Sequence, residues 1–107
     1  RMNLNLLAGA TSARMLFDFG KIIYNVYMSI YWAVYGNVAN TADATLEISD
    51  DNITYKILVQ NNNLDTEQSD EFHNLSFRFV RIRGDGAILL TGTTGLFCST
   101  LIVRDAI

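Results

Sequence analysis

The sequence predicts an all-β fold, namely an antiparallel β-sandwich, jelly-roll-like, of about eight strands. Apolar and polar residues alternate in many short segments, which is the period of a strand and not of a helix. Clusters of Gly, Asn, Asp, Ser and Thr separate these segments, and such residues favour turns. Half of the 107 residues are hydrophobic, enough for one packed core. We therefore expect residues 1–107 to form a single domain.

The longest strand pattern covers residues 22–35 (IIYNVYMSIYWAVY). Ten of these fourteen residues are β-branched or aromatic, a composition that favours strand. One face of the pattern has no polar interruption and carries Trp32, which is therefore predicted to lie in the core. A helix remains an alternative, because Tyr27, Tyr31 and Tyr35 also recur at helical spacing. The run is shorter than the about 20 apolar residues that a membrane helix needs.

Shorter alternating segments surround this strand on both sides. The clearest pair is a hairpin around residues 49–52 (SDDN), whose short polar side chains favour a turn. A later segment changes its apolar phase, which predicts a β-bulge near Val80. A further turn is expected at residues 84–86 (GDG). In chain order, these shorter strands are predicted at residues 2–6, 13–19, 44–48, 53–59, 72–83, 87–90 and 96–104.

Residues 60–73 (QNNNLDTEQSDEFH) are predicted to form a polar, exposed and mobile loop. This segment carries four of the eleven acidic residues and the single histidine, His73. Its carboxylates could in principle hold Ca²⁺ through oxygen ligands. The pattern lacks the spacing of a calcium loop, and no cluster of ligands accompanies His73. We expect no metal and no cofactor, and the favoured interpretation of the segment is a solvated loop.

No arrangement of residues in the sequence indicates catalysis. None of the serines has a His–Asp context that would activate a nucleophile, and no paired carboxylates stand out. Cys98 is the only cysteine, so an internal disulfide is excluded, and its apolar neighbours predict a buried thiol. The protein is therefore not expected to be an enzyme.

The net charge of −3 argues against nonspecific binding to nucleic acid or to an acidic membrane. A basic strip is formed by Arg78, Arg81 and Arg83, and we expect it to pair with the acidic loop or with acids of a partner. Residues 83–85 spell the adhesion tripeptide Arg-Gly-Asp, but a turn explains the glycine equally well.

The face of residues 22–35 opposite to Trp32 predicts an interface. This stretch contains no charge, whereas the solvated face of an antiparallel sheet normally carries charged or small polar residues. Tyrosine combines a large apolar area with a hydroxyl that can stay hydrogen-bonded, and it is enriched in interfaces. We therefore predict that Tyr27, Tyr31 and Tyr35 contact a second copy of the chain. Alternatively, a loop of the same chain, such as 60–73, covers them.

Three segments together resemble known families. Residues 44–55 (ATLEISDDNITY) and 77–83 (FRFVRIR) resemble a strand–turn–strand unit and a returning strand of small β-sandwich modules. These occur in discoidin-type (coagulation factor 5/8 C) domains, which bind sugars or lipid headgroups, and in short virion proteins of tailed bacteriophages. The opening, residues 4–13 followed by 17–20, is similar to the start of the phage proteins. Compared with discoidin domains, the chain is shorter and lacks the usual cysteine pair.

The phage resemblance implies a non-enzymatic structural protein of the virion. It implies a capsid decoration (cement) protein or a tail-associated module that forms a symmetric homo-oligomer, with a trimer as one option. The partners would be further copies of the chain and other virion proteins, such as the major capsid protein. The alternative is a carbohydrate-binding module of discoidin type.

Overall fold

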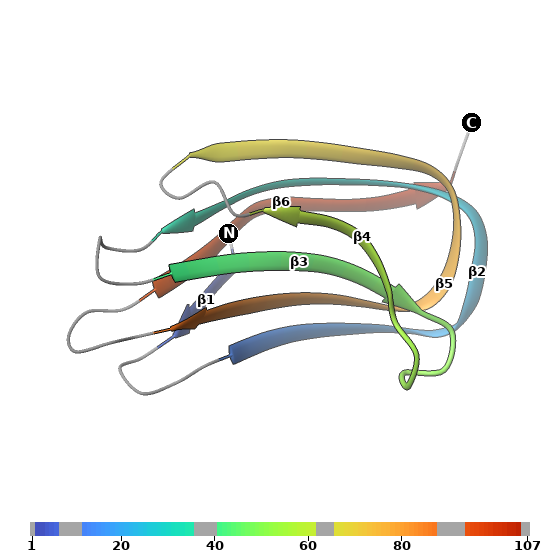
Figure 1. Ribbon diagram of the computed structural model, residues 1–107. Coiled ribbons are helices and arrows are strands. Elements are labelled where there is room, and N and C mark those ends of the chain that lie inside the picture. The colour runs from blue at the N-terminus through green and yellow to red at the C-terminus, as the bar shows by residue number, and fades with distance from the viewer. Residues whose placement is uncertain (1, 7–11, 36–40, 62–65, 88–93, 106–107) are drawn as a thin grey trace.

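The computed structural model describes residues 2–6, 12–35, 41–61, 66–87 and 94–105. These residues form one antiparallel sheet of six strands, in the order β1-β6-β2-β5-β3-β4 (Figure 1). The described part of the chain contains no helix long and apolar enough to cross a membrane. The strands are β1 (Met2–Leu6), β2 (Ser12–Tyr35), β3 (Thr41–Ser49), β4 (Lys56–Asn61), β5 (Glu67–Ala87) and β6 (Thr94–Asp105).

The two longest strands, β2 and β5, divide the sheet into two halves. In the upper half, residues 26–35 of β2 pair with β6 on one side and with residues 67–75 of β5 on the other, and β1 pairs with β6. In the lower half, residues 12–18 of β2 pair with residues 79–85 of β5, which also pairs with β3, and β4 pairs with β3. Both long strands turn back at the same end, so the two halves face each other (Figure 1).

Residues with left-handed backbone conformation lie where the long strands bend. In β2 these are Gly20 (φ 83°) and Asn25 (φ 52°), and in β5 it is Asn74 (φ 57°). Glycine adopts this conformation without steric cost, and asparagine adopts it more readily than other residues with a side chain. The N–H of Gly20 also donates a 2.8 Å hydrogen bond to Asp18. The local sequence thus permits both strands to fold over.

The core fills the space between the two halves. Because side chains alternate along a strand, β2 directs every second residue of its upper half inward. The lower half contributes the inward residues of β3 and β5. The ring of Phe19 packs edge-on against that of Phe77 at the bend, with centroids 5.6 Å apart. The buried cluster contains Val26, Met28, Ile30, Trp32, Ala44, Leu46, Ile48, Phe77, Val80 and Ile82.

The predicted all-β antiparallel fold is confirmed. The described residues form six strands where about eight were predicted. One strand fewer results because residues 13–19 and 22–35 belong to one bent strand, β2, and the strand predicted at 87–90 accounts for the other. The helical alternative for residues 22–35 is therefore wrong. Of the strand predicted at 87–90, Ala87 is the last residue of β5, and residues 88–90 lie outside the described residues.

One of two predictions about the core is confirmed. Trp32 is buried, with 1% of its surface exposed. The bulge predicted near Val80 is wrong in its position. The apolar phase of β5 does change between Phe77 and Val80, which both lie in the core, but Val80 itself pairs regularly with Phe17 of β2 and Ile48 of β3. The extra residues belong to β2, because residues 19–22 of β2 are inserted opposite a single residue of β5.

Two predictions of non-strand segments, the loop at residues 60–73 and the turn at 84–86, are wrong. Most of residues 60–73 is strand, because 60–61 end β4 and 67–73 begin β5, while residues 62–65 lie outside the described residues. The turn predicted at 84–86 is also strand, since these residues pair with β3. In both segments, pairing with a neighbouring strand outweighs the turn preference of the local residues. The adhesion tripeptide at 83–85 is consequently part of an extended strand.

Candidate interaction surface

The outer side of β2 in the upper half carries Tyr27, Ser29 and Tyr31. These residues alternate with the buried Met28 and Ile30, so the strand geometry directs them away from the core. Tyr31 is the most open of the three, with 39% of its surface exposed. The face predicted from the sequence is thus an outer face of the sheet. Tyr35 is the last residue of β2, and its side chain lies outside the described part of the structure.

Carboxylates of β5 accept hydrogen bonds from both tyrosine hydroxyls. Tyr27 donates to Oε2 of Glu71 over 2.8 Å, and Tyr31 donates to Oε2 of Glu67. Tyrosine side chains bury well when the hydroxyl has a partner. These hydrogen bonds therefore leave the aromatic rings available for an apolar contact while their polar ends remain satisfied.

The ring of Tyr27 is also held from the side. The guanidinium of Arg104, on β6, lies 4.3 Å from its centroid, and the ring of His73 lies 5.1 Å from it. A cation over an aromatic face is attracted by the negative face of the ring. Tyr27 is therefore fixed in place, whereas Tyr31 presents more of its surface to solvent.

Strand β6 extends this surface on the other side of β2. Its register sets Thr100 beside Tyr31 and Ile102 beside Ser29, and both β6 residues are exposed. We call Tyr27, Ser29, Tyr31, Thr100 and Ile102 the tyrosine surface. Its members are uncharged, and Glu67, Glu71 and Arg104 border it. An uncharged centre with a charged rim is the usual anatomy of a protein interface.

A buried ionic cluster occupies the outer face of the lower half. The carboxylate of Glu47, on β3, has only 2% of its side chain exposed, and it contacts two arginines of β5. Nε of Arg81 lies 2.9 Å from Oε2, and Nη1 of Arg83 lies 3.3 Å from Oε1. The ring of Tyr55 covers the Arg81 guanidinium at 3.7 Å. Burial raises the pKa of the Tyr55 hydroxyl.

The cluster corrects the prediction for the basic strip. Arg81 and Arg83 pair with Glu47, and Arg78 pairs with Asp18 of β2 over 2.9 Å. None of these acids belongs to residues 60–73, so the ion pairs among the described residues are not those predicted with the acidic segment. The reason is the register: β3 and β2 lie directly beside β5 in the lower half, whereas residues 67–73 belong to the upper half. Pairing with the acids of a partner stays a prediction.

The predicted turn at residues 49–52 is confirmed and is held by side-chain hydrogen bonds. Oδ1 of Asp51 accepts from the N–H groups of Ile53 (2.8 Å) and Thr54 (2.9 Å). Both hydrogen bonds from the backbone lower the pKa of Asp51, and the bond from Thr54 has the larger effect. Asn52 adopts a left-handed conformation (φ 62°). The turn therefore positions Tyr55 over the ionic cluster.

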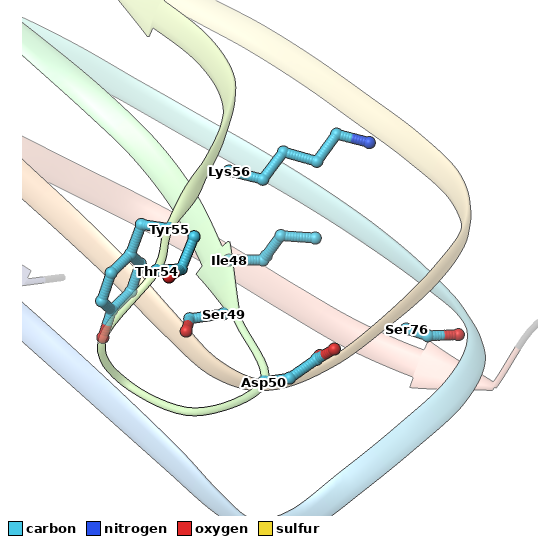
Figure 2. A pocket seen from close by; sticks show the side chains of 7 residues that line it. All are labelled: Ile48, Ser49, Asp50, Thr54, Tyr55, Lys56 and Ser76. Carbon is cyan, nitrogen blue, oxygen red and sulfur yellow. The ribbon is translucent and has the colours of Figure 1, made fainter.

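A shallow pocket of about 190 Å³ lies beside this turn. Figure 2 shows Ile48 reaching toward it from β3, with Lys56 on one side and Asp50 near Ser76 on the other. Hydroxyls, one carboxylate and one ammonium group thus surround an apolar base. Such a set of groups can form hydrogen bonds with a small polar ligand. The lining residues are Ile48, Ser49, Asp50, Thr54, Tyr55, Lys56 and Ser76.

The other residues considered from the sequence lie apart from one another. His73 lies beside Tyr27 with Nε2 at 3.9 Å from Glu71, at the border of the tyrosine surface. Cys98 belongs to β6, and its side chain lies outside the described part. Among the described residues, no group of three or more His, Cys, Asp or Glu side chains is arranged to hold a metal ion.

No protein-family model matches the chain, and no curated protein matches its sequence significantly. The resemblance to phage virion proteins and to discoidin-type modules therefore stays a proposal.

Proposed function

We propose that this protein is a non-enzymatic structural component that assembles with copies of itself. The tyrosine surface carries this proposal. It presents two tyrosines with satisfied hydroxyls and an exposed isoleucine on the outer side of a sheet, and charges border it. Contiguous apolar area rimmed by polar residues marks an interaction site in soluble proteins. A sheet face of this kind suits a contact with another folded protein.

The class of assembly that we propose is a virion. The resemblance of residues 4–13, 17–20, 44–55 and 77–83 to small phage proteins supports a capsid decoration protein or a tail-associated module. In this proposal the two four-stranded halves correspond to the layers of a jelly-roll-like sandwich, joined by β2 and β5. The protein would form a symmetric oligomer and bind other virion proteins, such as the major capsid protein.

The assembly state of the purified protein tests this proposal. Size-exclusion chromatography with light scattering is expected to show a discrete oligomer at micromolar concentration, with a mass that is an integer multiple of the chain. Closed symmetric oligomers give such a single species. A monomer that persists up to the highest soluble concentration would contradict self-assembly.

A carbohydrate-binding module is the second candidate, and the pocket beside Tyr55 favours it. The pocket offers hydroxyls, one carboxylate and one ammonium group next to an aromatic ring (Figure 2). Sugars are bound by hydrogen bonds to their hydroxyls together with apolar contact to their ring faces. The discoidin-type resemblance of residues 44–55, which include the turn beside this pocket, points to the same function.

A glycan array separates the two candidates. A structural virion protein needs no sugar site, so binding of the wild-type protein is expected to stay at background. Specific binding that is lost in Tyr55→Ala and Lys56→Ala would favour the carbohydrate-binding module. Tyr31→Ala, far from the pocket in the upper half, is the matched control and should not change such binding.

A further inference from the structure

The first part of β2 forms an open edge of the sheet. Residues 12–18 pair with β5 on one side, and none of the described residues pairs with them on the other. Strand β6 joins β2 only from Val26 onward. In Figure 1 this part of β2 is the lowest strand of the lower half. An open edge presents unpaired N–H and C=O groups to any chain that can extend the sheet.

The edge formed by residues 67–73 of β5 is protected against such pairing. Its outward side carries Glu67 and Glu71. If this edge paired symmetrically with the same edge of a second copy, these glutamates would face glutamates of that copy. Its inward side carries Asp70, which accepts a 2.9 Å hydrogen bond from the buried Trp32. Inward-pointing charges on edge strands prevent edge-to-edge association. Strand β4, which ends the sheet order opposite to β1, begins at the exposed Lys56, and lysine has the same effect.

The open edge of β2 carries a different pattern of side chains. Arg14, Leu16 and Asp18 share its outer face and are exposed, and 48% of the surface of Leu16 is open. The two charges are of opposite sign and each lies two residues from Leu16. The pattern is therefore complementary to itself when a second strand runs in the opposite direction.

The side chains select one register for such a pair. With a two-fold axis at Leu16, Leu16 faces its own copy and each Arg14 faces Asp18 of the second copy. An axis at Arg14 or at Asp18 would set like charges opposite each other, which is destabilising. An axis at Met15 or Phe17 would set Leu16 opposite a charged side chain. Of these registers, only the pairing centred on Leu16 matches both the apolar residue and the charges.

We propose that residues 12–18 of β2 bind the same segment of a second copy, as an antiparallel pair about a two-fold axis at Leu16. The lower halves of the two copies would then form one continuous sheet. A two-fold contact uses the same patch on both copies, so the patch must be complementary to itself. The pattern of Arg14, Leu16 and Asp18 on this edge meets that requirement. The contact is distinct from the tyrosine surface, which lies on the upper half, and it does not depend on the proposed virion role.

Cross-linking of a Leu16→Cys variant tests the register directly. Directly opposite residues in an antiparallel pair have Cβ atoms about 4.5–5.5 Å apart, within reach of a disulfide or a short bis-thiol reagent. The variant is expected to form a covalent dimer at micromolar concentration. Ile53→Cys is the control, because Ile53 is 84% exposed in the turn after β3. Dimer formation no greater than that of Ile53→Cys and of the wild type would overturn the proposal.

Charge reversal tests the complementarity. Arg14→Asp, introduced into the Leu16→Cys variant, sets two like-charge pairs across the contact and is expected to weaken dimerisation at least about tenfold. Adding Asp18→Arg should restore it. Because Asp18 also pairs with Arg78, circular dichroism must first show that this variant is folded. Unchanged cross-linking in the Arg14→Asp variant would refute the proposed register even if the double variant does not fold.

A Tyr31→Lys change in the Leu16→Cys variant separates this contact from the proposed function. The cross-link is expected to persist, because Tyr31 lies on the upper half. If the wild type assembles but the Leu16→Cys variant does not cross-link, the edge contact fails while the tyrosine surface stands. If the Leu16→Cys variant cross-links and Tyr31→Lys leaves the assembly unchanged, the edge contact stands and the tyrosine surface fails.

Discussion

At the scale of single residues, Glu47 is the charged residue that is most deeply buried in the described part of the structure. Its carboxylate is buried between Arg81 and Arg83, and charged groups leave water only at a high free-energy cost. The ion pairs offset this cost only while both the glutamate and its arginines are present. The cluster could not be predicted from the sequence, because Glu47 and Arg81 are 34 residues apart and only the register of β3 with β5 brings them together.

The first prediction is that Glu47→Ala strongly destabilises the protein. Removing one member of a buried ion pair leaves the other uncompensated, which typically costs about 3–5 kcal/mol. We expect the free energy of unfolding to fall by an amount near the lower end of this range, because Arg81 and Arg83 can still reach water. Urea unfolding followed by circular dichroism gives the value. Arg78→Ala removes an exposed pair and should change the stability far less, and equal losses in the two variants would contradict this account.

The second prediction concerns Asp51 and pH. Hydrogen bonds from the N–H groups of Thr54 and Ile53 lower the folded-state pKa of Asp51 below its ordinary 3.8. A lowered pKa stabilises the folded state at pH values above the unfolded pKa, and the contribution disappears as the pH falls through the folded pKa. Asp51→Ala should therefore reduce stability at about pH 6 and have less effect near about pH 2.

Thermal unfolding at several pH values measures this difference. Asp50→Ala removes a charge at the neighbouring position without removing the two backbone hydrogen bonds of Asp51, and it serves as the control. A destabilisation by Asp51→Ala that is the same at all these pH values would show that the carboxylate charge does not hold the turn.

At the scale of elements, the bends of β2 and β5 give the sheet its shape. The sequence signals were present, since Gly20, Asn25 and Asn74 are residues that tolerate left-handed backbone. The alternation in residues 13–19 and 22–35 correctly predicted strand on both sides of Gly20. It could not show that the chain continues through as one strand, because a turn and a bend use the same residue types.

The third prediction tests the bend in β5 at the exposed Asn74. Asn74→Gly keeps the left-handed conformation without a side chain and should leave the stability nearly unchanged. Asn74→Val places a β-branched residue at φ 57°, where the side chain meets the backbone, and should cost about 1–2 kcal/mol. Denaturant unfolding of both variants checks this. If valine is tolerated as well as glycine, the backbone of β5 does not require this conformation.

At the scale of the whole molecule, the outer faces of the two halves differ in character. That of the lower half carries the ionic cluster, whereas that of the upper half carries the tyrosine surface. The alternation of residues 22–35 correctly predicted which side of the strand faces outward from Val26 to Trp32. It was wrong at Ile22 and Tyr24, which were predicted on the core face and are exposed, because the register of β2 is irregular between Asp18 and Met28. It did not predict Glu67 and Glu71 as partners of the tyrosines, because the polar composition of residues 60–73 predicted a loop. Strand pairing at an edge tolerates such residues, and composition alone does not reveal it.

The central claim is that the tyrosine surface joins copies of the chain, and sedimentation velocity of Tyr31→Lys tests it most directly. A lysine at the middle of a contact would bury an unpaired charge, which is costly. Ile53→Lys, which places the same charge on the turn after β3, is the matched control. We predict that Tyr31→Lys sediments as a smaller species with an unchanged β-type circular dichroism spectrum, while Ile53→Lys keeps the wild-type assembly. If Tyr31→Lys retains both the assembly and the stability of the wild type, the tyrosine surface is not the interface.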